Sequence, residues 1–90
     1  MRTLVLASSF KRVVKRQPEL QARIEERLTL LAAEPFDLQL QTHKLKGKLS
    51  GAWGCSVEYD CCIVFNFVRN LESGEEEILL IDIGTHDEVY

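Results

Sequence analysis

The sequence has 90 residues, of which 46% are hydrophobic, and a formal net charge of −3. This length fits one domain over residues 1–90, and the hydrophobic share is enough for one small core. No stretch approaches the ~18–20 consecutive apolar residues of a membrane span. The short apolar run near the start is too brief for a signal peptide. The composition therefore argues against a membrane protein and predicts a cytoplasmic domain.

The charge is unevenly distributed along the chain. Residues 1–48 contain ten Lys/Arg and five Asp/Glu, whereas residues 49–90 contain one Lys/Arg and nine Asp/Glu. The basic half could contact a polyanion while the acidic half faces solvent or a basic partner. Two differently charged, solvated faces would give the same pattern, so charge alone does not identify the partner.

The first half of the chain predicts a strand followed by two helices. Branched apolar residues in Arg2–Ala7 favour a strand, and Ser8 or Ser9 can then cap a helix. Its apolar side chains share one face: Phe10, Val13 and Val14. A second helix begins with Pro18 in its first turn, where the missing N–H costs nothing, and ends near Ala33. Its apolar stripe consists of Leu20, Ile24, Leu28 and Leu31.

Residues 34–41 are predicted to form a loop. Before this loop apolar residues recur every three or four positions, as in a helix, and after it they recur at every second position, as in a strand. Residues 43–51 predict a bent or bulged strand that turns at Ser50–Gly51. The next strand places one set of side chains on one face: Trp53, Cys55, Val57 and Tyr59. Residues 60–68 are almost continuously apolar, as in a central strand, and Ser73–Gly74 indicates a hairpin into a last strand over 78–83.

The predicted order of elements is βααββββ, which defines an α+β fold. A helical hairpin packs on one face of a mainly antiparallel, twisted sheet. Thr85 and Glu88 fit a capping box, which predicts a short C-terminal turn. His86 would lie in the first turn, just after the last strand.

The three cysteines, Cys55, Cys61 and Cys62, are an odd number with two adjacent, which argues against a disulfide framework. Reduced, buried thiols are expected. A zinc site built from these thiols with His43 and His86 has suitable ligand types but no supporting spacing. Adjacent strand residues also point to opposite faces, so the three thiols cannot converge easily.

A second candidate is an acid–base site formed by His43, Asp60 and His86. It would be bordered by Lys44, Lys46, Lys48 and Tyr90. RNA transesterification needs a base for the ribose 2′-hydroxyl proton, cations for the phosphate and an acid for the departing 5′-oxygen. No metal or cofactor is required. Spacing alone leaves this as one interpretation among several, because a lone histidine is usually a surface residue.

Three segments together resemble the RelE/ParE superfamily of type II toxins, and most closely its YafQ-like branch. They are His43–Trp53 ("HKLKGKLSG…W"), Tyr59–Phe65 ("YDCCIVF") and Ile83–Tyr90 ("IGTHDEVY"). The branch pattern is H-x-L-x-G, then tryptophan, then D-x-x-I-x-[FY], then G-T-H-x-x-[LVI]-[FY]. Each motif is weak by itself, but their order and spacing cover almost the whole chain.

The resemblance implies a ribosome-dependent mRNA endonuclease that is held inactive by a cognate antitoxin. Its partners would be the antitoxin, the ribosome and mRNA, with DNA contacted only indirectly through the antitoxin and no membrane involved. By position, His43, Asp60 and His86 match the branch's catalytic residues. Tyr90 matches a final aromatic residue that would stack on a base or align the substrate.

The sequence departs from the branch at two positions. Relatives often carry a basic residue where this chain has Cys62, and an arginine or histidine about where it has Ser56. A thiol cannot replace the bidentate fork that arginine offers to phosphate. A weak or inactive binding module, or a ParE-like gyrase inhibitor, therefore remain as alternatives. For both the nuclease and the binding module, the basic helices and residues 43–48 are expected to line one concave face, with His43 and His86 close together.

Overall fold

The computed structural model describes residues 2–45, 51–58 and 61–84. Several predicted residues lie outside these ranges: Lys46, Lys48, Ser50, Tyr59, Asp60, Thr85, His86, Glu88 and Tyr90. The predictions for these residues, including the C-terminal turn, therefore remain predictions.

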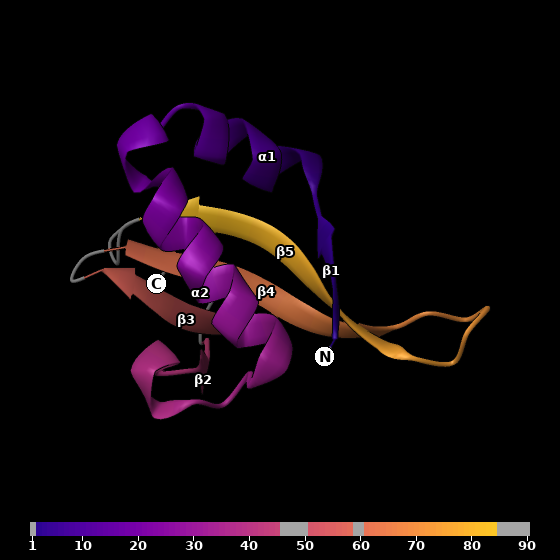
Figure 1. The fold of residues 1–90 in the computed structure, drawn as a ribbon. Helices are drawn as coiled ribbons and strands as arrows, with labels where there is room; N and C mark the ends of the chain where they lie inside the picture. Colours follow the sequence, from indigo (N-terminus) through magenta and orange to yellow (C-terminus); the bar gives the residue numbers. More distant parts are fainter. Residues whose placement is uncertain (1, 46–50, 59–60, 85–90) are drawn as a thin grey trace.

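The described elements confirm the α+β fold and the order βααββββ (Figure 1). They are β1 (Thr3–Leu6), α1 (Ser8–Lys15), the 3₁₀ turn η1 (Pro18–Leu20), α2 (Gln21–Ala33), the 3₁₀ turn η2 (Leu38–Leu40), β2 (His43–Lys44), β3 (Trp53–Glu58), β4 (Cys61–Arg69) and β5 (Glu76–Gly84). The strand order in the sheet is β1-β5-β4-β3-β2. β1 runs parallel to β5, and the other neighbouring strands are antiparallel.

The main core lies between the two helices and one face of the sheet. Phe10 of α1 and Ile24 and Leu31 of α2 are at most 2% exposed. They pack in one cluster with side chains from β3, β4 and β5: Cys55, Val57, Ile63, Phe65, Ile78, Leu80 and Ile83. This confirms the predicted apolar helix faces, because the apolar residues at helical spacing are the ones that meet the sheet.

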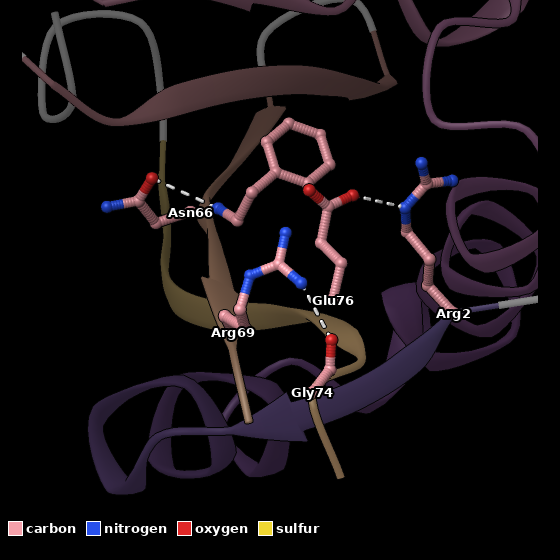
Figure 2. Close-up of polar contacts among 6 residues, drawn as sticks. Arg2, Asn66, Arg69, Gly74 and Glu76 are labelled. Carbon is pink, nitrogen blue, oxygen red and sulfur yellow. Dashed lines mark hydrogen bonds and ion pairs between the residues drawn. The ribbon is translucent and has the colours of Figure 1, made fainter. Parts of the chain in front are cut away.

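β4 lies at the centre of the sheet, as its long apolar run predicts. The hairpin from β4 to β5 is closed by side chains of the turn. Asn70 Oδ1 accepts hydrogen bonds from the N–H groups of Glu72 (2.9 Å) and Ser73 (3.2 Å). Arg69 Nη1 donates to the carbonyl of Gly74 at 2.7 Å (Figure 2). Gly74 has φ 74°, which glycine adopts without steric cost.

The predicted start of the first helix is wrong in one detail. Neither Ser8 nor Ser9 caps it, because the N-cap residue is Ala7 and no side chain caps the helix. The Ser9 hydroxyl instead donates to the carbonyl of Ile81 at 2.6 Å. This bond ties α1 to β5, so tertiary contact takes precedence over local capping. None of the helices in the described ranges is long and apolar enough to cross a membrane.

Candidate functional site

The strand register separates the predicted site residues between the two faces of the sheet. Residues opposite each other in an antiparallel pair share a face. His43 is opposite Gly54, and Gly54 is opposite Val64, whereas Lys44 is opposite Trp53. Trp53 packs against the helix-side core. Lys44 therefore points to the helix side, and its Nζ lies 5.5 Å from the centre of the Trp53 ring. His43 points to the other side.

We call the side of the sheet away from the helices the distal face. Among the described residues it includes His43, Gly54, Ser56, Cys62, Val64 and Asp82. One row runs across it from His43 through Gly54 and Val64 to Asp82. A neighbouring row joins Ser56, Cys62 and Gly84. Gly84 is the last described residue of β5, and the predicted site residues that follow it lie outside the described ranges.

The ring of His43 is exposed and held in one orientation. Its Nδ1 lies 2.8 Å from the carbonyl oxygen of Gln41. A carbonyl can only accept a hydrogen bond, so Nδ1 must carry the proton in this contact. Nε2 is then the basic nitrogen of the neutral ring. Gln41 has φ 51°, a left-handed conformation uncommon for a non-glycine residue. The local backbone thus selects the tautomer that suits a general base.

Asp82 is a distal-face residue that the sequence analysis did not single out. It is exposed and lies opposite Val64, and its Oδ1 accepts a hydrogen bond from the N–H of Ile83 at 2.8 Å. A bulge between Val64 and Phe65 shifts the register of β5 at this point. Three strand spacings, about 14 Å, separate the backbones of His43 and Asp82. The carboxylate therefore adds negative charge to the face without touching His43.

Cys62 occupies the distal face as a buried apolar residue. It is 1% exposed and packs with Leu45, Ala52 and Val64 in a second, smaller cluster. Cys61 instead packs against the helix-side core. Adjacent cysteines thus point to opposite faces, as predicted. The buried state expected for the thiols is confirmed for Cys55 and Cys62, whereas Cys61 is partly exposed. Within the described ranges, no three potential ligands cluster as a metal site would require.

Positive charge is absent from the described strand positions of the distal face. Both helices pack their buried residues on the opposite side of the sheet. The expectation that the basic helices and the strand after residue 43 share one concave face is therefore wrong for the described residues. Its physical reason is the period of the strand, which turns Lys44 away from His43. Lys46 and Lys48 lie outside the described residues, so their role as cations remains a prediction.

Burial raises the pKa of the Cys55 thiol from its ordinary 9.0 to about 12, and the nearby Cys62 adds to the increase. Between these two values the unfolded chain loses this proton while the folded protein keeps it. The free energy of unfolding should therefore fall as pH rises from 9 towards 12, by up to about 1.4 kcal/mol per pH unit for this group. Below pH 9 the Cys55 thiol is protonated in both states, so it does not make the free energy of unfolding depend on pH.

Urea denaturation at several alkaline pH values measures this slope. The matched variant Cys55→Ala should lose stability less steeply, since all other titrating groups are kept. Equal slopes in the two proteins would contradict the assigned pKa.

Comparison with known proteins shows the same fold in bacterial toxins. YafQ from E. coli strain BL21(DE3) superimposes with a TM-score of 0.77 at 17% identity, over 100% of this chain and 99% of that chain. A conserved hypothetical protein from Helicobacter pylori matches with a TM-score of 0.66 at 30% identity, over 100% of both chains. The E. coli DinJ–YafQ toxin–antitoxin complex matches with a TM-score of 0.74 at 18% identity, over 99% and 97%. No curated protein matches the sequence.

The fold is therefore the one found in solved bacterial toxins such as YafQ. Residues 2–90 also match the family model described as the bacterial toxin of a type II toxin–antitoxin system, YafQ. The chain belongs to this YafQ family and is a toxin of a type II toxin–antitoxin system. The resemblance seen in the three sequence motifs is confirmed.

Proposed function

We propose that this toxin is an endoribonuclease that cuts mRNA on the ribosome in the cytoplasm. The observation that carries this proposal is the exposed His43, whose Nδ1–H is held by Gln41 so that Nε2 is the basic nitrogen. His43 lies on the distal face of the sheet. Family membership supports the reaction class, because YafQ- and RelE-like toxins are in general endoribonucleases.

The proposed reaction needs two proton transfers and no metal or cofactor. His43 Nε2 accepts the proton of the ribose 2′-hydroxyl, and the oxygen attacks the adjacent phosphorus. The bond from phosphorus to the 5′-oxygen breaks, and His86 donates a proton to that oxygen. The products are a 2′,3′-cyclic phosphate and a 5′-hydroxyl. Asp60 would orient the acid–base pair, and Tyr90 would stack on a base.

Cations must balance the charge that develops on the phosphate. Lys46 and Lys48 are proposed for this role, whereas Lys44 points to the opposite face of the sheet. Removing one such transition-state contact typically lowers a rate by about 10²–10³-fold. The proposed partners are the ribosome, mRNA and a cognate antitoxin. The relative YafQ forms a complex with the antitoxin DinJ, which supports the antitoxin assignment.

The test is to incubate the purified toxin with a programmed ribosome and to map the message ends. We expect cleavage that depends on the ribosome, resists EDTA, leaves 5′-hydroxyl ends and stops when the cognate antitoxin is added. Cleavage of naked RNA at the same rate would contradict ribosome dependence. A ribosome complex without any cleavage would contradict the nuclease.

A non-catalytic module that binds the ribosome or the antitoxin is the second candidate function. Two observations favour it: the apolar burial of Cys62, where relatives carry a basic residue, and the carboxylate of Asp82 on the distal face. Both make the described part of this face less suited to an anion. Ribosome pelleting combined with the cleavage assay separates the two functions, because the module would pellet with ribosomes and leave the message intact.

The environment of Cys62 also predicts what happens when the missing arginine is introduced. Cys62→Arg would place a guanidinium in a site that is 1% exposed and lined by apolar side chains. An uncompensated buried charge costs about 3–5 kcal/mol, so a large loss of stability is expected in chemical denaturation. The matched variant Ser56→Arg, at a partly exposed position on the same face, should lose much less. Equal stability of Cys62→Arg and the parent would contradict this packing.

A further inference from the structure

Aromatic rings on the helix side of the sheet form a column that begins in the core and ends in solvent. Phe65 is fully buried in the main core, and the ring of Phe67 meets it edge to face at a centroid distance of 5.5 Å. Phe36 then stacks on Phe67 at 5.9 Å, with an interplanar angle of 26°. Phe36 is 59% exposed, so the ring face turned away from Phe67 is open to solvent. Another planar group could continue this column without displacing any core residue.

Trp53 supports Phe36 from the side of the column. The two rings meet edge to face, with centroids 5.4 Å apart and an interplanar angle of 78°. Trp53 also meets Phe67 edge to face at 5.8 Å. Edge-to-face and offset-stacked contacts are the favourable geometries for aromatic pairs, so the three rings hold one another in place. We call Phe36, Trp53 and Phe67 the aromatic platform.

The loop that carries Phe36 is held by its own contacts, so the platform is formed before any ligand arrives. The Thr42 hydroxyl donates a hydrogen bond to the carbonyl of Pro35. Leu40, which lies between these two residues in the same loop, is fully buried in the main core. A ligand therefore loses little binding free energy to ordering this loop.

Two cations lie beside the platform and restrict what can bind there. The Lys44 ammonium group lies 5.5 Å from the centre of the Trp53 ring, and the Arg2 guanidinium carbon lies 5.9 Å from that of Phe67. Both distances are within the ~6 Å range of a cation–π contact, so each of these rings already has a cation. Lys44 and Arg2 would repel a further cation, which disfavours a basic peptide as the occupant.

The two cations differ in what they offer to a ligand. Arg2 Nε is paired with Glu76 Oε1 at 2.7 Å, which Figure 2 shows. Lys44 is exposed and forms no ion pair with a carboxylate in the described part of the chain. Trp53 contacts both Lys44 and Phe36, so the ammonium group and the open ring are separated by about the length of one nucleotide. Lys44 is therefore the cation available to a phosphate.

We propose that an unpaired base of RNA stacks on the open face of Phe36 while Lys44 contacts a neighbouring phosphate, an inference that rests on the RNA substrate class of the proposed function. Every base has a planar face that can stack on an aromatic ring, so the contact requires no particular sequence. The platform lies on the helix side of the sheet and His43 on the distal face, so this contact would hold RNA and take no part in the reaction. The RNA is either the message or ribosomal RNA, which share this chemistry.

Binding of a single-stranded oligonucleotide tests the platform without depending on cleavage. The probe is a 2′-O-methyl hexaadenylate, whose blocked 2′-oxygen cannot attack phosphorus. Trp53 is the only tryptophan of the chain and belongs to the platform, so its fluorescence reports whether the platform is occupied. We expect the probe to quench this fluorescence and to bind about tenfold more tightly than the same strand in a duplex, whose bases are already stacked. Equal affinity for the two forms, or no binding of the probe, would overturn the proposal.

Substitutions in the loop separate stacking from general apolar contact. Phe36→Leu keeps an apolar side chain but removes the ring, so it should weaken binding of the probe by about tenfold. Phe36→Tyr keeps the ring and should bind like the parent. The matched control is Leu38→Ala, at a side chain that is 92% exposed in the same loop, and it should also bind like the parent. Equal losses in Phe36→Leu and Leu38→Ala would indicate a general apolar surface and overturn the stacking site.

The phosphate contact has a separate readout in the salt dependence of binding. For Lys44→Gln, the slope of log affinity against log salt concentration should fall by about 0.7, the value for one phosphate of a single strand. Lys15→Gln, at an exposed lysine of α1, is the matched control and should leave the slope unchanged. A lower slope in Lys15→Gln but not in Lys44→Gln would place the RNA on α1 and overturn the role of Lys44.

Ribosome pelleting identifies the source of the RNA. A base from ribosomal RNA predicts that Phe36→Leu reduces binding to vacant and to programmed ribosomes alike, whereas a base from the message predicts a loss with programmed ribosomes only. Unchanged binding to both would overturn the site on the ribosome.

Failure of this site and failure of the proposed function give different results. A toxin that binds the probe through Phe36 but cuts no message would refute the nuclease alone. A toxin that cuts the message but binds the probe equally well with and without the Phe36 ring would refute the platform alone. Circular dichroism checks that each variant used in these comparisons is folded.

Discussion

Replacing His43 with alanine is expected to lower the rate of message cleavage by about 10²–10⁴-fold, the usual contribution of a general base. The reason is the loss of Nε2 as proton acceptor on the distal face. The fold should persist, because the ring is exposed and lies outside both hydrophobic clusters. The measurement is cleavage by purified toxin on ribosomes, together with growth after induced expression.

Two further variants make this result specific. His86→Ala should cause a loss of similar size if the two imidazoles form the acid–base pair. Gln39→Ala, on an exposed side chain in η2, should cleave like the parent. Growth arrest that persists in both histidine variants would contradict the nuclease. It would point instead to a mode that needs no histidine, such as gyrase inhibition.

Phe10→Ala is expected to destabilise the protein by about 3–5 kcal/mol, because a large buried side chain is lost and a cavity remains. Phe10 is fully buried and is the residue through which α1 enters the helix-side core. Small domains are stable by about 5–15 kcal/mol in total. The variant should therefore unfold at a much lower urea concentration, and it should accumulate poorly in cells.

Phe36→Ala is the matched control for this loss. The Phe36 ring is 59% exposed, although it contacts the rings of Trp53 and Phe67 at centroid distances of 5.4 and 5.9 Å. Its removal leaves no closed cavity, so the decrease in the free energy of unfolding should be about 1 kcal/mol. A loss at Phe36 as large as that at Phe10 would contradict the division between core and surface described above.

Most of the fold could be predicted because hydrophobic periodicity reflects burial directly. The stripe through Ile24 and Leu31 predicts the face of α2 that meets the sheet, and the apolar run of β4 predicts its central place. The parallel pairing of β1 with β5 could not be predicted in this way, because β1 is short and no local signal specifies its partner. Ser9 shows a similar limit, since its bond to Ile81 is made across the fold.

The candidate site was less predictable than the fold. The motif places His43 and Lys44 side by side in sequence, yet the strand period puts them on opposite faces. The sequence alone does not give the register of β2 and β3. With that register known, the alternation of side chains along the strands would have placed Lys44 on the face of Trp53 and His43 on the other face. Asp82 was overlooked because a single acid in an apolar strand suggests solvent exposure. Its place in the row with His43 depends on pairing across three strand interfaces.

The pairing of β1 with β5 also affects how the toxin is made. Thr3 is opposite Glu77, so the sheet joins segments from near the two ends of the described chain. Contacts this distant in sequence form late, because a long loop must close first. A nascent toxin cannot complete its sheet until β5 has left the translating ribosome. The toxin is therefore incompletely folded while its own chain is still being translated.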